Sequence, residues 1–144
     1  MYQKDYILRM VEMLGDLLAA IFGLIRKGDY QKAGENLERV YYDMLKEDAA
    51  FFRSIPKDDL THKLLEEHNY TNGHLEILAE LFNTEAELAM AKGDKKETLE
   101  YAEKALLLFE FVDTSQKTLS LERLDKMSFI RERIEGLRGA GSIR

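Results

Sequence analysis

An all-α fold of about six helices is predicted by three features of the sequence. Apolar residues recur at spacings of three and four over long segments, and no segment alternates apolar and polar residues as a half-buried strand would. Proline, which interrupts helices, occurs only at Pro56. The dipeptide Gly-Asp at Gly28 returns at Gly93, and each copy ends one apolar segment and starts another. We therefore expect two antiparallel helical hairpins and a capping C-terminal helix in one bundle.

Length and composition fit a single domain. The chain has 144 residues, of which 45% are hydrophobic and 33% are charged, and a chain of this size can bury an independent core. We expect this domain to span residues 1–138 and residues 139–144 to form a flexible tail. The sequence contains no cysteine, which excludes disulfides and thiolate metal ligands. No uncharged run is long enough for a membrane span, and the first residues do not resemble a secretory signal, so we expect a cytoplasmic protein without membrane contact.

Charge is distributed unevenly along the chain. The net charge of -6 argues against a nucleic-acid binder, which normally carries a positive face. Residues 115–144 nevertheless contain seven Lys or Arg and four Asp or Glu, a local charge of +3, which leaves -9 for residues 1–114. We expect a basic helix that packs on an acidic body, and a specific anionic partner is the alternative.

The first predicted helix spans residues 4–27 and ends at Gly28. Apolar residues cover most of its circumference, which is typical of a helix that is buried on nearly all sides. In so small a protein, such a helix either lies at the centre of the bundle or reserves one face for a second subunit. Both alternatives stay open at this point.

The second predicted helix starts after Asp29, a favourable N-cap, and continues to about residue 47. An irregular segment with apolar residues follows it. Pro56 then favours the start of a short helix over residues 57–67, because proline lacks the amide that would stay unpaired in the first turn. The buried stripe of the second helix is expected to comprise Ala33, Leu37, Val40, Tyr41 and Met44.

Three further helices are predicted after residue 72. Asn72-Gly73 indicates a break before a helix over residues 74–92, which carries two apolar stripes and should have neighbours on two sides. Asp94 and Glu97 have the spacing of a capping box at the start of the next helix, which extends to about residue 112. The last helix covers residues 118–137, and its buried stripe is expected to comprise Leu124, Met127, Ile130, Ile134 and Leu137.

Two sets of residues occupy corresponding positions in the two hairpins: Gly28, Asp29, Tyr30, Ala33 and Val40 in the first copy, and Ala86, Gly93, Asp94, Tyr101, Ala105 and Leu106 in the second. With these residues both hairpins resemble the tetratricopeptide repeat, in which two helices turn on Gly-Asp and pack small residues where they cross. The resemblance implies a scaffold for protein contacts. The copies lie 65 residues apart instead of the family's repeat of about 34, and the family's Lys and Asn clamp for a peptide carboxylate is absent.

The order of residues over the whole chain, from residues 4–10 to residues 119–123, also resembles a small family of bacterial helical proteins of uncharacterised function. That resemblance implies no activity.

The sequence favours a non-enzymatic module that binds a protein or peptide and uses no cofactor. It contains no glycine-rich phosphate loop and no recognisable catalytic motif. The expected partner surface is the inner face of the helix over residues 74–92 and its neighbour, and it comprises Glu80, Asn83, Glu87 and Tyr101. A structural homodimer that uses the helix over residues 4–27 is the alternative.

The three histidines leave a more remote alternative, a metal-dependent enzyme. His62, His68 and His74 are six residues apart, an interval that rotates side chains by about 240° on one helix and so does not place them on one face. Glu66 or Glu67 could complete a ligand set. The Glu-x-x-His motif of carboxylate-bridged metal centres is absent, so we expect polar residues around a connection and no metal site.

Overall fold

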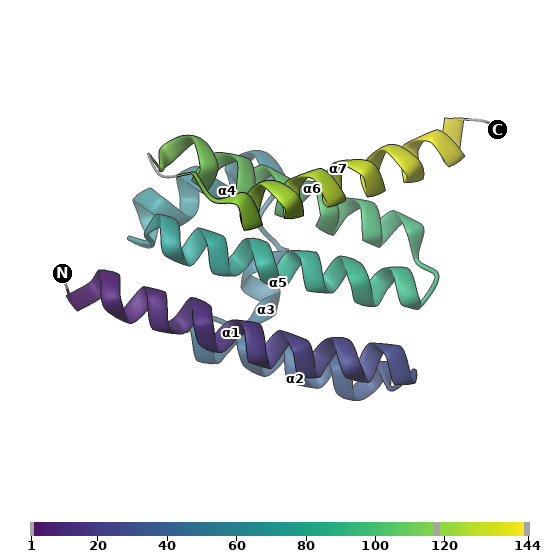
Figure 1. Ribbon diagram of the computed structural model, residues 1–144, viewed down its shortest axis with the longest axis horizontal. Helices are drawn as coiled ribbons and strands as arrows, with labels where there is room; N and C mark the ends of the chain where they lie inside the picture. Colours follow the sequence, from purple (N-terminus) through teal and green to yellow (C-terminus); the bar gives the residue numbers. More distant parts are fainter. Residues whose placement is uncertain (1, 117–118, 143–144) are drawn as a thin grey trace.

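The computed structural model describes the backbone of residues 2–116 and 119–142 and the side chains of residues 8–116 and 119–139. Within these ranges the protein is all-α, as the sequence predicts, and has no strand. A 3-10 turn, η1 (Lys57–Asp59), and a π-helical turn, η2 (Lys63–Glu67), flank α4. The α1/α2 pair lies on one side of α5, and α6 and α7 lie on the other (Figure 1). The α-helices are α1 (Tyr2–Lys27), α2 (Tyr30–Leu45), α3 (Ala49–Arg53), α4 (Leu60–His62), α5 (Asn72–Ala91), α6 (Lys95–Ser115) and α7 (Leu121–Ser142).

The two Gly-Asp turns have the same geometry, and both expected hairpins are present. Gly28 has a φ of 85° and Gly93 a φ of 83°, in the left-handed region that glycine adopts without strain from a Cβ. The N–H of the following aspartate donates to the carbonyl five residues earlier, at 2.9 Å in both turns. The side chains of Asp29 and Asp94 then accept from the amide three residues later, at 3.2 and 3.0 Å.

The central helix is α5. It packs against α1, α2 and α6, and both of its predicted apolar stripes are buried except at Met90, which is 36% exposed. In contrast, α1 buries one stripe, which includes Leu14 and Ile21, and exposes Met13 and Leu17 beside that stripe. The alternative that places the first helix at the centre of the bundle is therefore wrong. The alternative that its outer face binds a second subunit stays a prediction.

One continuous core joins the two hairpins. Tyr41 of α2 stacks on Phe52 of α3 at a centroid distance of 5.9 Å, and Phe82 of α5 lies 5.8 Å from Tyr101 of α6. These rings lie where α2, α3, α5 and α6 meet. The predicted stripe of α2 is buried in full: Ala33, Leu37, Val40, Tyr41 and Met44.

The connection between the hairpins is more helical than the sequence suggests. After α2 ends at Leu45, the capping residue Lys46 has a φ of 63°. The side chain of Asp48 then accepts from the amide of Phe51 at 2.9 Å and starts α3. The expected irregular segment is thus a short helix here. After Pro56 the predicted helix is present as the succession η1, α4 and η2, which changes from 3-10 through α to π geometry.

The start of α5 differs from the prediction. Asn72 is the first residue of the helix, so the expected break at Asn72-Gly73 is wrong. Thr71 and His74 form a capping box: the Thr71 hydroxyl accepts from the His74 amide at 3.4 Å, and the Thr71 amide donates to the His74 ring at 3.0 Å. The chain turns earlier, at Asn69, which has a φ of 56°. The pattern was missed because histidine holds a position where glutamate or glutamine is usual.

The last helix, α7, packs on α6 along the predicted stripe. Met127, Ile130 and Ile134 are buried, and Leu124 and Leu137 are half-buried. The helix continues to Ser142, so the expected tail is helical over residues 139–142, and residues 143–144 lie outside the described part of the chain.

Candidate functional site

A cleft of about 420 Å³ opens between α2 and the α5/α6 hairpin. Four elements form it. It is lined by Tyr30, Gln31, Gly34, Glu35 and Glu38 of α2, Arg53 of α3, Glu85, Leu88 and Lys92 at the end of α5, and Glu97 and Tyr101 of α6. The cleft therefore depends on how the two hairpins meet, and neither hairpin forms it alone.

A buried ion pair anchors the cleft. The side chain of Glu85 is 7% exposed, and its Oε2 accepts from Nη2 of Arg53 at 2.7 Å, from Nε of Arg53 at 2.8 Å and from the Tyr41 hydroxyl at 3.0 Å. The Nη1 of Arg53 lies 2.7 Å from Glu38. Arg53 thereby connects α3 to both α2 and α5, and two of its N–H groups converge on one carboxylate oxygen of Glu85 in charge-assisted hydrogen bonds.

Burial and charge set the protonation of these groups. Burial raises the pKa of Glu85, and the attraction of Arg53 opposes this change. Burial alone would lower the pKa of Arg53, but Glu85 and Glu38 outweigh it and the pKa is raised. Burial, and then the charge of Glu85, raise the pKa values of Tyr41 and Tyr101. At neutral pH Arg53 is thus a fixed cation and both tyrosines keep their hydroxyl protons.

Acidic residues dominate the rim of the cleft. Glu35 and Glu97 lie there with one basic residue, Lys92. Burial, and then the neighbouring Asp94, raise the pKa of Glu97. An adjoining hollow of about 280 Å³ shares Glu97 and Tyr101 with the cleft and adds Asp94, Glu100 and Lys96. The acidic character therefore continues around the end of the second hairpin.

The four predicted site residues do not lie on one surface. Tyr101 lines the cleft. Glu80 and Glu87 lie on another side of α5, where each forms an ion pair with a basic residue of α7, and the intervening Asn83 has a buried side-chain oxygen without a hydrogen-bond partner. The expected packing of a basic helix on an acidic body is thus present at this seam. The binding of a partner by these residues stays a prediction.

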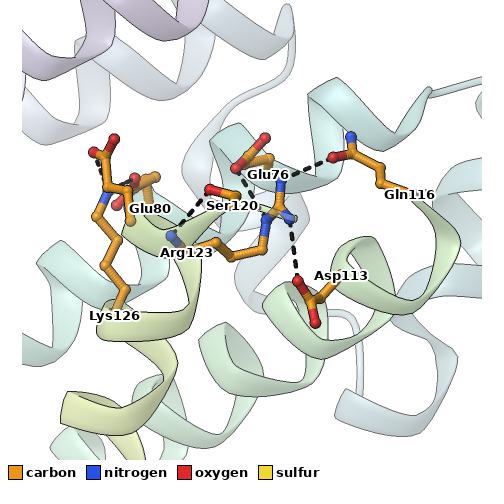
Figure 2. A network of polar contacts seen from close by, with 8 residues as sticks. Glu76, Glu80, Asp113, Gln116, Ser120, Arg123 and Lys126 are labelled. Atoms are coloured by element: carbon orange, nitrogen blue, oxygen red, sulfur yellow. Dashed lines mark hydrogen bonds and ion pairs between the residues drawn. The ribbon is translucent and has the colours of Figure 1, made fainter. Parts of the chain in front are cut away.

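Figure 2 shows the centre of this seam, where Arg123 lies among polar side chains from three helices. The Arg123 side chain is 5% exposed. Its guanidinium donates to Gln116 at 2.8 Å, to Asp113 at 3.2 Å and to Glu76 at 3.4 Å. Its backbone amide donates to the Ser120 hydroxyl at 3.2 Å. Arg123 therefore holds the start of α7 to the end of α6 and the first turns of α5.

The three histidines have separate roles in the connection between the hairpins. His62 pairs with Glu66 on the exposed side of the chain at 2.7 Å, and His68 packs edge-on against an aromatic ring. His74 stacks on Tyr70 at 4.8 Å and caps α5. Within the described residues, no three His, Asp or Glu side chains converge as metal ligands would.

Sequence reasoning missed the ion pair of Arg53 and Glu85. Arg53 lies in the segment that was expected to be irregular, and Glu85 interrupts the apolar run of α5 next to Ala86. That interruption is a usable signal, because a carboxylate at a buried position requires a charged or hydrogen-bonding partner. The identity of the partner depends on tertiary structure, since Arg53 is 32 residues away in the chain.

Comparisons with known protein families, with curated proteins and with solved structures give no match to this chain. In the described part of the chain, no helix combines the length and the apolar character needed to cross a bilayer.

Proposed function

We propose that the protein is a non-enzymatic interaction module that binds a basic segment of another protein in the cleft between its hairpins. The observation that carries the proposal is the cleft itself: an opening of about 420 Å³ whose walls come from two hairpins and whose charged lining is mostly acidic. Repeated helical hairpins commonly present such concave surfaces to partners. The resemblance to the tetratricopeptide repeat points in the same direction, and the cytoplasm remains the expected location.

The balance of charge favours a cationic ligand. Arg53 is committed to Glu38 and Glu85 through short contacts. The remaining charged residues of the lining are Glu35, Glu97 and Lys92, which leaves an excess of negative charge. Tyr30 adds a half-buried aromatic ring, and aromatic rings attract lysine and arginine side chains through cation–π contacts.

The test uses two fluorescent peptides of equal length, one rich in lysine and one rich in glutamate. We expect only the lysine-rich peptide to bind, with NMR shifts centred on Tyr30, Glu35 and Tyr101. The variant Glu35→Lys/Glu97→Lys should weaken binding by at least about tenfold, because a cationic rim repels the ligand.

A matched control distinguishes binding in the cleft from a general effect of net charge on peptide binding. Glu12 and Asp16 are exposed on α1 and do not line the cleft, so Glu12→Lys/Asp16→Lys makes the same change in net charge elsewhere. We expect this variant to retain most of the binding. Equal loss in both variants, or NMR shifts scattered over the surface, would contradict the cleft as the site.

A structural homodimer remains a second candidate because of the outer face of α1. Met13 is 59% exposed and Leu17 is 40% exposed, and their spacing of four places them on one side of the helix. Light scattering over a dilution series should then give twice the chain mass, and Met13→Lys/Leu17→Lys should give the monomer mass. A monomer at all concentrations would remove this candidate. No specific observation favours the metal-dependent enzyme, and we do not propose it.

A further inference from the structure

Electrostatic contacts attach α7 to the rest of the bundle. Each of its five basic side chains forms an ion pair with an acidic residue of α5 or α6, and Figure 2 shows two of the five, Arg123 and Lys126. Arg133 pairs with Glu87 of α5 at 2.6 Å, Arg131 pairs with Glu110 of α6 at 3.0 Å, and Arg138 also pairs with α6. The opposite charges therefore lie along nearly the whole helix.

The apolar part of the α7 contact is small in comparison. Among its described side chains, α7 buries three apolar residues, Met127, Ile130 and Ile134, over a length of 22 residues. The central helix α5 buries nine over 20 residues. Hydrophobic burial supplies most of the stability of a packed helix, so α7 is held less firmly than α5 or α6.

The contact between α5 and α7 also leaves polar groups unsatisfied. The Oδ1 of Asn83 on α5 and the Nη1 of Arg133 on α7 are buried without hydrogen-bond partners. Burial raises the pKa of Glu80, although the attraction of Lys126 opposes this change. A buried polar group without a partner is destabilising. Removal of α7 would return these groups to water.

We infer that α7 is a displaceable occupant of an acidic face on α5 and α6, and that this face binds a basic amphipathic helix of a partner protein when α7 leaves. The acidic face comprises Glu76, Glu80 and Glu87 of α5 and Glu103, Glu110 and Asp113 of α6. It lies on another side of α5 from the cleft, so this inference does not depend on the proposed function.

The sequence of α7 defines the chemistry of the partner. Its cations toward α5 lie at Arg123, Lys126 and Arg133, and the buried Ile130 and Ile134 lie among them. A competing helix therefore needs basic residues at intervals of three and seven with a short aliphatic stripe. Such a helix is recognised by one apolar stripe and by complementary charges on either side, as in other helix-in-groove complexes.

The experiment adds a basic helix as a separate peptide and measures whether it binds the acidic face. A fluorescent peptide with the sequence of residues 119–142 is titrated into the full chain and into the full-length variant Lys126→Glu/Arg133→Glu, in which α7 is repelled but the acidic face is intact. We expect the variant to bind the peptide at least about tenfold more tightly, because in the original chain the tethered α7 competes at a high effective concentration. Adding Glu80→Lys/Glu87→Lys to that variant should abolish binding.

Two controls separate displacement from general charge effects. Lys32→Glu/Lys57→Glu makes the same change in charge at exposed positions away from α7, and it should bind the peptide as weakly as the original chain. Because the chain has no cysteine, Glu103→Cys/Arg138→Cys can be bridged by a short bis-maleimide that ties α7 to α6. The bridged protein should not bind the peptide. Equal affinity for the original chain and the repelled variant would overturn the inference.

The variant Lys126→Glu/Arg133→Glu could fail to fold. In that case hydrogen exchange on the unmodified protein tests the inference. Amides of α7 should exchange faster than those of α5, and high salt should accelerate exchange in α7 alone, because salt screens ion pairs at the surface. Equal protection of α7 and α5, or a salt effect common to both helices, would also overturn the inference.

Discussion

The hairpins α1/α2 and α5/α6 close with the same turn but contribute differently to the molecule. In both, a left-handed glycine ends the first helix and an aspartate caps the second. Beyond the turn, α5 is enclosed by neighbours, whereas α1 has one buried stripe and an exposed outer face. Local turn chemistry therefore specifies a hairpin without specifying its place in the bundle. The distribution of apolar residues around each helix decides that place.

The largest expected difference between the hairpins is in the cost of removing one large apolar side chain. Phe82→Ala should lower the free energy of unfolding by about 4 kcal/mol, because Phe82 is fully buried between the Tyr41 and Tyr101 rings. Leu17→Ala in α1 should cost only about 1 kcal/mol, since Leu17 is 40% exposed. Urea denaturation measures both values. A large loss for Leu17→Ala would instead indicate that a second subunit covers the outer face of α1.

The ion pair that joins the hairpins should have the next largest effect. Glu85→Ala should destabilise the protein by about 3 kcal/mol, because it leaves Arg53 and the buried Tyr41 hydroxyl without their main partner. Glu38→Ala removes the other, more exposed partner of Arg53 and should cost less than about 1 kcal/mol. Thermal unfolding of the two variants provides the comparison, and equal losses would mean that Arg53 is held by solvent-exposed contacts alone.

The two turns should respond equally to the same substitution. Gly28→Ala and Gly93→Ala should each cost about 1 to 2 kcal/mol, the strain of a left-handed residue with a Cβ. An added Cβ meets no atom within 4 Å at either position, so packing adds nothing to the strain. Chemical denaturation of both variants measures the two losses of unfolding free energy, which should be equal. A difference of more than about 1 kcal/mol would show that the surroundings contribute to the turn.

The smallest predicted effect is a pH dependence of the stability, which arises from His74 at the start of the second hairpin. Burial lowers the pKa of His74 from its usual value of 6.5, and its ring nitrogen accepts the Thr71 amide only when it carries no proton. The unfolded chain then binds more protons than the folded one, so this contribution to stability is complete above 6.5 and decreases as the pH falls through the lowered pKa. His74→Gln, which keeps an acceptor, should reduce this slope in urea denaturation. An unchanged slope would assign it to other groups.

Much of the fold is predictable because its signals are local. The turns at Gly28 and Gly93, the cap at Asp94 and the buried stripe of α2 follow from residues within one or two turns of helix. The same holds for the attraction between the basic C-terminal part and the acidic body, which follows from composition and takes the form of the α7 ion pairs.

The rest depends on contacts between residues that are distant in the chain. Apolar residues cover most of the circumference of α1, which predicts burial on nearly all sides. In the structure α1 packs mainly against α2 and α5, and α5 is the central helix. For the candidate site, Tyr101 could be named from the repeat pattern, whereas Arg53 and Glu85 could not be paired by sequence spacing. The choice of Glu80 and Glu87 as an open surface did not account for α7, which lies against them.

The position of α5 has a consequence for the chain while it is being made. Synthesis proceeds from the N-terminus, and domains begin to fold as they emerge. The α1/α2 hairpin leaves the ribosome before α5, the helix against which both of its members pack, and residues 46–71 separate the two. Until α5 emerges, α1 can pack on α2 but not on α5, whereas α5 can pack on α6 as soon as the next helix is complete. We therefore expect the nascent first hairpin to expose apolar surface, and so to be open to chaperones and to premature association, until α5 is made.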